Sequence, residues 1–118
     1  MLALHLKLGR KAESFTAKMM QGENYKIVAH NVNYPCGEID LIAQNRQQIV
    51  FVEVRSRASS EFGLPEETVG RNNQQKIIAA EKLWVQKNDP SGEYQCRFDM
   101  IGFSAGKPSW IQNAFEAI

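Results

Sequence analysis

Hydrophobic and polar positions alternate along the 118-residue chain with two different periods. Apolar residues recur at spacings of three and four over residues 7–21, and again in a second helix that begins between residues 66 and 72 and ends by residue 88. Four segments have the composition of β-strands: residues 25–32, 37–43, 49–57 and 94–103. The order helix, three strands, helix, strand predicts an α/β fold, with a mixed sheet of about four strands flanked by helices. The apolar tail, residues 110–118, fits a strand or a helix.

The two central strand segments carry acids among apolar residues. A polar stretch of turn length joins them, so they are predicted to form a β-hairpin. Side chains alternate between the faces of a strand, which places Glu38 and Asp40 on one face of the first strand and Glu53, Arg55 and Arg57 on one face of the second. Carboxylates in such surroundings cost several kcal/mol unless they are paired or bound to a metal. The hairpin is therefore the strongest candidate for a functional site.

Bulk composition narrows the class of protein. With 43% hydrophobic and 23% charged residues, the chain is typical of a globular protein, and its length predicts one domain over residues 1–118. A net charge of +1 gives no overall basic field, so a nucleic-acid partner would need a local patch or a metal. The apolar N-terminal run is too short for a signal peptide, and no segment is long enough to span a membrane. Two isolated cysteines, Cys36 and Cys96, are expected to be free and buried. We expect a cytoplasmic protein.

The order of several motifs resembles a known family. Gly37-Glu38-Ile39-Asp40, followed on the next strand by the acid-x-base triplet Glu53-Val54-Arg55, resembles the restriction-endonuclease-like, or PD-(D/E)xK, nuclease superfamily. The chain is more closely similar to the YraN-type uncharacterised bacterial proteins, which look like distant relatives of archaeal Holliday-junction resolvases. The resemblance is strongest over residues 9–103 and extends weakly to residues 113–115. It includes Gly9 and Glu13 on the first helix, Lys76 on the second, and Arg97-Phe98-Asp99 on a late strand.

This resemblance implies a restriction-endonuclease-like sheet and a site for Mg²⁺ or Mn²⁺. Asp40 and Glu53 would be metal ligands on neighbouring strands, and the carbonyl of Val54 would be a third. Glu13 would complete or orient the site from the first helix, and Arg55 would stabilise charge on the phosphate. Mg²⁺ prefers oxygen ligands and provides both charge neutralisation and an activated water, which phosphodiester hydrolysis requires.

Arg55 departs from the usual pattern of the superfamily, whose triplet ends in lysine. An arginine remains protonated and presents a planar fork, so the exchange is not conservative in a tight site. Stabilisation of phosphate charge is compatible with Arg55, whereas a role in proton transfer is not.

The implied activity is hydrolysis of phosphodiester bonds in DNA, including branched or damaged structures. Arg57, Arg71 and Lys76 would contact the nucleic acid. Junction-cutting relatives act as dimers, so the resemblance also implies a homodimer, and a small domain of near-zero net charge would depend on protein partners in DNA processing.

Less specific interpretations compete with a nuclease site. Asp40 and Glu53 could form a structural ion-pair cluster with Arg55, Arg57 or Lys76, and Glu13 alone is typical of a solvated helix acid. In that case, neutralising Asp40 or Glu53 would destabilise the fold, whereas removal of one acid from a metal site would be neutral or stabilising without metal. The domain could also be a non-catalytic nucleic-acid-binding or protein-interaction module on a nuclease scaffold.

Overall fold

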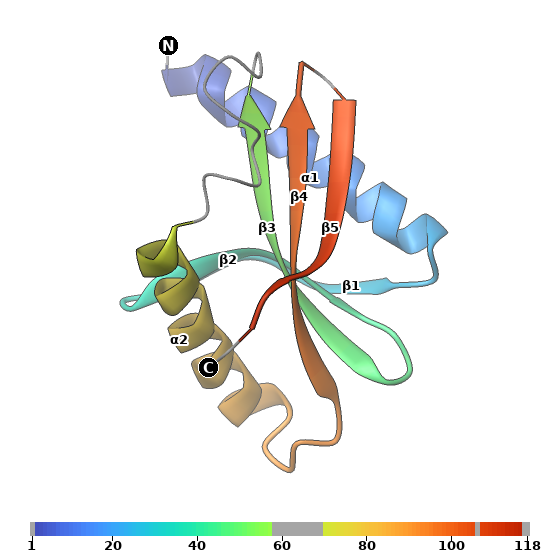
Figure 1. The fold of residues 1–118 in the computed structure, drawn as a ribbon, viewed down its shortest axis with the longest axis vertical. Helices are drawn as coiled ribbons and strands as arrows, with labels where there is room; N and C mark the ends of the chain where they lie inside the picture. The colour runs from blue at the N-terminus through green and yellow to red at the C-terminus, as the bar shows by residue number, and fades with distance from the viewer. Residues whose placement is uncertain (1, 58–69, 106, 117–118) are drawn as a thin grey trace.

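The computed structural model describes residues 2–57, 70–105 and 107–116. Within these ranges the chain forms two helices and one five-stranded sheet (Figure 1). In chain order the elements are α1 (Leu2–Gly22), β1 (Lys26–Tyr34), β2 (Gly37–Gln44), β3 (Gln48–Arg57), α2 (Arg71–Asn88), β4 (Gln95–Ser104) and β5 (Lys107–Phe115). The predicted α/β class and the order of the first six elements are confirmed.

The five strands lie in the sheet in the order in which they occur in the chain. Neighbouring strands are antiparallel except β3 and β4, which pair in parallel over their whole length. A parallel pair requires a crossover connection, and α2 lies in the connection between these two strands. The sheet is therefore mixed, as predicted, and Figure 1 shows that β1 and β2 run across the direction of β4 and β5.

Each helix covers one face of the sheet. A cluster of buried residues joins α1 to Leu41, Val52 and Ile101, and a second cluster joins α2 to Phe51 and Phe98. Figure 1 shows α1 crossing behind the sheet, with α2 at its other side. Residues 49–52 are all buried, because β3 is covered on both faces and both of its faces must be apolar. An acid that follows residues 49–52 in β3 therefore lies close to apolar, low-dielectric surroundings.

The tail that fitted either a strand or a helix is the fifth strand. β5 begins at Lys107 and ends at Phe115. The ladder with β4 is irregular between Phe98 and Met100, and Asn113 adopts a positive φ of 54° opposite this break. The backbone N–H of Asn113 donates to Asp99 at 3.0 Å. A side chain of β4 thus binds the backbone of β5 at the point where the regular pairing is interrupted.

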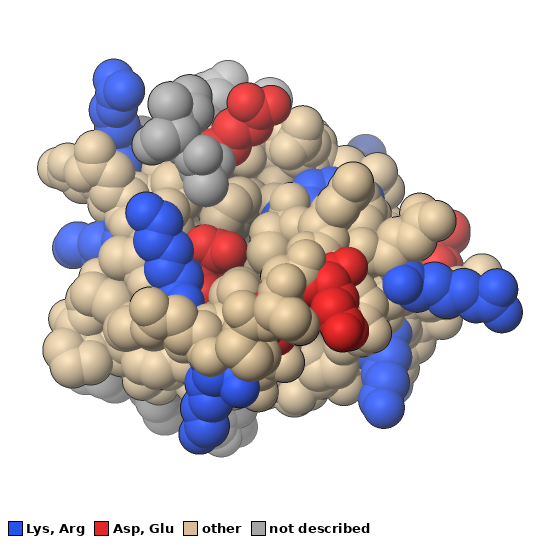
Figure 2. Space-filling view, turned by 90° about the horizontal axis from the view of Figure 1, so that it is seen from below, with Lys and Arg blue, Asp and Glu red and all other residues tan. Residues whose placement is uncertain are grey.

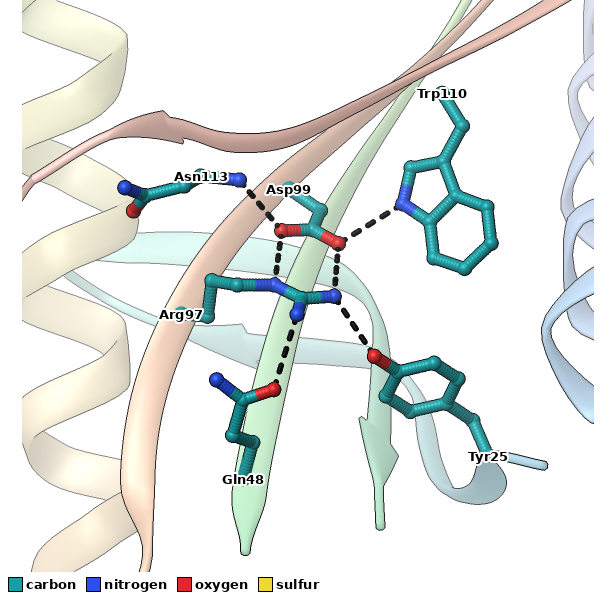
Figure 3. A network of polar contacts seen from close by, with 6 residues as sticks. All are labelled: Tyr25, Gln48, Arg97, Asp99, Trp110 and Asn113. Atoms are coloured by element: carbon teal, nitrogen blue, oxygen red, sulfur yellow. Dashed lines mark hydrogen bonds and ion pairs between the residues drawn. The ribbon is translucent and has the colours of Figure 1, made fainter. Parts of the chain in front are cut away.

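Asp99 is fully buried and is the centre of a polar network (Figure 3). The guanidinium of Arg97 donates to both of its carboxylate oxygens, at 2.8 Å each, and the indole Nε1 of Trp110 donates at 2.9 Å. Arg97 also donates to Gln48 and to the Tyr25 hydroxyl, each at 3.0 Å. The network joins β3, β4 and β5 to the residue that precedes β1.

Two further expectations are tested by the fold. Cys36 and Cys96 are free, as predicted, but both are exposed, so the expectation that they are buried was wrong. Cys36 lies between β1 and β2, and Cys96 lies near the start of β4. Neither helix, over the residues that are described, is long and apolar enough to cross a membrane.

Asp99→Asn should strongly destabilise the fold. The substitution leaves the guanidinium of Arg97 without its charged partner, and breaking a buried ion pair typically costs roughly 3 kcal/mol or more. Urea unfolding would measure this loss, with Glu93→Gln as a matched control because Glu93 is exposed. Equal unfolding midpoints for the two variants would show that the network does not hold the strands together.

Candidate functional site

The site begins where β2 and β3 stop pairing through their backbones. Their register extends from Gln44 opposite Ile49 to Leu41 opposite Val52. Immediately beyond this point, the backbone N–H of Val54 donates to Oδ2 of Asp40 at 2.8 Å. β3 continues to pair with β4 as far as Arg57. A carboxylate therefore occupies the position of a backbone acceptor, and it holds the two strands together at the break.

Glu53 and Arg55 project from β3 beside this break, on one face as the strand alternation predicted. Arg55 Nη2 lies 3.0 Å from Glu53 Oε1, and the two side chains are 34% and 11% exposed, respectively. The Nε atom of Arg55 is buried and has no hydrogen-bond partner among the described residues. A buried N–H donor without an acceptor is energetically costly. Binding of an anion at this position would supply the missing acceptor.

The carboxyls of Asp40 and Glu53 are in contact, and both have a raised pKa. Burial raises the pKa of Asp40 to about 6, against the lowering effect of the Val54 N–H, and the charges of Glu13 and Glu38 raise it further. Burial, followed by the charge of Asp40, raises the pKa of Glu53 to about 8, although Arg55 opposes this change. One arginine therefore does not compensate two adjacent acids, and this region disfavours a second negative charge.

Glu13 lies close enough to Asp40 for its charge to act on that carboxyl. It accepts a hydrogen bond from Nδ2 of Asn31 at 3.4 Å, and its charge contributes to the raised pKa of Asp40. Within the described residues, no three His, Cys, Asp or Glu side chains come together in an arrangement that would hold a metal ion. The structure thus brings Asp40, Glu53 and Arg55 together and leaves Glu13 at the edge of the site.

Two carboxylates in contact match the requirements of one hard cation. Mg²⁺ is commonly held by one or two carboxylates and retains several of its waters. A divalent ion would also remove the charge crowding that raises the pKa values of Asp40 and Glu53. The amide of Val54 points to Asp40. That the carbonyl of Val54 is a third metal ligand stays a prediction.

A cavity of about 440 Å³ opens beside Glu53 and Arg55. The end of β1 contributes Asn33 and Tyr34 to its lining, the connection to β2 contributes Cys36, and the first turns of α2 contribute Asn73 and Lys76. Glu38 also lines it, which confirms that this acid faces the site region.

Gly37 fixes the distance between β2 and α2 at this cavity. A Cβ atom at position 37 would lie 2.4 Å from the carbonyl oxygen of Lys76 and 3.1 Å from its Cβ. Only glycine permits this approach, because every other side chain would push the helix away. The backbone of Lys76 is held against the sheet beside Glu53 as a result.

Two of the three residues predicted to contact nucleic acid have described side chains, and they lie in different surroundings. Lys76 lines the cavity, whereas Arg71 is exposed at the start of α2 and is not part of the lining. The side chain of Arg57 lies outside the described part of the structure.

Sequence reasoning missed the amide residues of the cavity. Asn33 and Tyr34 follow the first predicted strand, which ends at residue 32, although the structure includes both in β1, and Asn73 was assigned only to the start of a helix. Each belongs to a segment that is far from the hairpin acids in the chain. The only local signal was Gly37, which required a close approach that the sequence alone did not locate.

These features define an α/β protein with a paired-carboxylate site at a break between two strands of a mixed sheet. The chain matches the model of the uncharacterised protein family UPF0102 over residues 12–103. It belongs to this family, and the resemblance to YraN-type proteins is thereby confirmed.

Bacterial relatives match the chain over nearly its whole length. A UPF0102 protein of Francisella tularensis subsp. novicida (strain U112) is 37% identical over 114 residues, which cover 96% of this chain and 97% of the relative. A UPF0102 protein of Saccharophagus degradans is 38% identical, with 97% of each chain covered. A UPF0102 protein of Coxiella burnetii (strain RSA 493 / Nine Mile phase I) is 36% identical, with 98% of each covered.

Without divalent metal, Glu53→Gln should stabilise the protein at high pH. The folded-state pKa of Glu53 is raised above its ordinary value, so its favourable contribution is present at about pH 4 and is lost as the pH rises through about 8. The free energy of unfolding of the variant should exceed that of the wild type by roughly 2 kcal/mol at about pH 8.5, and the difference should shrink towards about pH 5. Urea unfolding in EDTA measures it.

Glu23→Gln, a change at an exposed acid, is the control and should show no such pH dependence. If Glu53→Gln instead destabilises the fold at high pH, the acids form a structural ion-pair cluster and the paired-carboxylate interpretation is wrong.

Gly37→Ala should destabilise the contact between β2 and α2. The added methyl group meets the Lys76 carbonyl at a distance that atoms do not tolerate, and overpacking of this kind costs roughly 1–3 kcal/mol. Gly22→Ala is the matched control, since nothing lies within 4 Å of a Cβ at that position. Urea midpoints that fall equally in both variants would mean that the contact at Gly37 is not tight.

Proposed function

We propose that this protein is a metal-dependent nuclease that hydrolyses phosphodiester bonds in DNA, including branched or damaged structures. The observation that carries the proposal is the contact between Asp40 and Glu53 at the break between β2 and β3, with Arg55 beside them. An acid at the end of one strand followed by an acid-x-base triplet on the next is the arrangement of restriction-endonuclease-like proteins. The mixed sheet, with a helix on each face, supports the same placement.

Each residue of the site has a distinct role in this proposal. Asp40 and Glu53 hold Mg²⁺ or Mn²⁺, which neutralises phosphate charge and lowers the pKa of a bound water. The buried Nε of Arg55 donates to a phosphate oxygen, and its ion pair with Glu53 keeps the guanidinium oriented until then. Glu13, at the edge of the site, orients groups near Asp40 and adds to the negative charge that attracts a cation.

Contacts to DNA outside the metal site come from a local patch. Figure 2, viewed from the end of the molecule below Figure 1, shows Lys and Arg side chains interspersed with Asp and Glu, so this face carries no continuous basic surface. Lys76 is an exposed cation at the cavity and forms no ion pair with any described residue. We assign the phosphate contacts to Lys76, with Arg57 and Arg71 beyond it. A homodimer and protein partners in DNA processing would supply the remaining affinity.

A second candidate is a non-catalytic nucleic-acid-binding module. The ion pair between Arg55 and Glu53 favours it, because it gives one of the two acids a structural partner. The raised pKa of Glu53, despite that partner, weighs against it, since a purely structural pair would not leave an acid so poorly compensated.

Metal-dependent cleavage tests the nuclease directly. Wild-type protein should cut end-labelled branched, flap, duplex or single-stranded DNA with Mg²⁺ or Mn²⁺, and should not cut in EDTA. Asp40→Asn and Glu53→Gln should lower the rate by roughly 100-fold or more, because each removes a metal ligand. The amide oxygen of Asn can still accept the Val54 N–H, so Asp40→Asn tests the charge while it retains the strand contact. RNA in the same assay compares the two nucleic acids.

Glu93→Gln, purified in the same way, is the control for contaminating nucleases and should cut as the wild type does. Cutting that is equal in all four proteins would identify a contaminant. No cutting by the wild type, together with retained DNA binding that Lys76→Gln weakens, would favour the binding module.

A further inference from the structure

The cavity beside the paired acids has walls that are fixed relative to each other. The end of β1 and the connection to β2 form one side, and the first turns of α2 form the other. The two sides meet where Gly37 packs against the backbone of Lys76, with no room for a Cβ atom. The cavity therefore cannot widen by separation of the strand from the helix at this point, unless the contact at Gly37 breaks.

The size of the cavity is that of a small-ligand site. Its volume of about 440 Å³ falls within the range of roughly 300–1,000 Å³ that is usual for small-molecule pockets. One nucleotide is a ligand of this size, whereas a base pair inside a double helix cannot enter such a space without leaving its stack.

The lining contains cationic side chains that are suited to a phosphate and amide side chains that are suited to a base. Arg55, with its unused buried Nε, and Lys76, which has no ion-pair partner among the described residues, are suited to phosphate oxygens. The amide of Asn73 offers donors and an acceptor, and the amide of Asn33, whose Nδ2 donates to the Asn31 carbonyl at 3.2 Å, retains a second N–H and its oxygen. Amides of this kind match the hydrogen-bonding edge of a base, and that edge is free only when the base is unpaired.

We propose that this cavity takes one unpaired nucleotide of the substrate strand, which places the neighbouring phosphate at the Asp40–Glu53 pair. The substrate class is then single-stranded DNA or a locally unpaired segment, such as a flap, bubble or branch point. This inference rests on the proposed nuclease function. It agrees with a net charge of +1, because a protein that binds duplex DNA mainly through many phosphate contacts needs a broad basic surface.

Cys36 gives a direct probe of occupancy. Its thiol is exposed and the residue lines the cavity, whereas Cys96 is exposed but lies outside the lining. Single-stranded DNA of about 16 nucleotides, a length suited to a single-strand site, should slow alkylation of Cys36. Burial and the neighbouring Glu81 raise the pKa of the Cys96 thiol to about 12, so this second thiol reacts slowly and contributes little to the measured rate. The same sequence as an intact duplex should protect Cys36 much less. Asp40→Asn protein in EDTA prevents cleavage during the measurement.

Binding and cleavage extend the test. The Asp40→Asn protein should bind single-stranded and bubble DNA roughly tenfold more tightly than intact duplex, and an added Asn73→Ala change should weaken single-strand binding roughly fivefold, the loss expected for one hydrogen bond. Lys87→Ala, at an exposed lysine in the last turn of α2, is the matched control and should have little effect. Wild-type cuts should fall at or beside unpaired nucleotides.

The outcomes separate this inference from the proposed function. Equal binding of duplex and single strand without protection of Cys36 overturns the inference, and the nuclease still stands if metal-dependent cutting persists. Protection of Cys36 by single strands without any cutting supports the nucleotide cavity and overturns the nuclease. An Asn73→Ala variant that binds as well as its parent overturns the assignment of the base contact.

Discussion

The buried ion pair between Arg97 and Asp99 is the interaction on which the architecture depends. Asp99 is fully buried, and both of its carboxylate oxygens accept hydrogen bonds. The donors are the guanidinium of Arg97, the indole N–H of Trp110 and a backbone N–H of β5. The free-energy cost of removing two charges from water is compensated only when both charged groups have hydrogen-bond partners in good geometry. Because the partners come from β3, β4, β5 and the residue before β1, this requirement fixes the relative positions of segments that are distant in the chain.

The acids of the candidate site stand in contrast to Asp99. Asp40 has one backbone donor, and Glu53 has one arginine, but each also faces the other carboxyl. Their surroundings therefore favour a proton or a cation, whereas the surroundings of Asp99 provide complete pairing. The same sheet holds both kinds of acid, and the difference is whether neighbouring strands supply enough donors. Excess negative charge beside an unused arginine donor is the physical basis for the proposed metal and phosphate sites.

The position of the site follows from how the sheet is connected. The pairing of β2 with β3 ends at Leu41 and Val52, so the part of β2 that precedes Leu41 is unpaired with β3, while β3 remains paired with β4. The crossover through α2 then brings the start of that helix back to the break, and Gly37 allows its backbone to pack closely. The chain belongs to the UPF0102 family, and relatives align with it over nearly the whole chain, including the segments that form this site.

The sequence by itself determined the two helices, the first four strands and the convergence of Asp40, Glu53 and Arg55, because period-2 and period-3.6 patterns and a hairpin act over short distances. It left β5 undecided, since that strand is held by contacts with Asp99 of β4 rather than by a strong local pattern. It also left the exposure of Cys36 and the amide lining of the cavity to the tertiary structure. Those features depend on how closely α2 approaches β2, a distance set by packing between segments that are far apart in the chain.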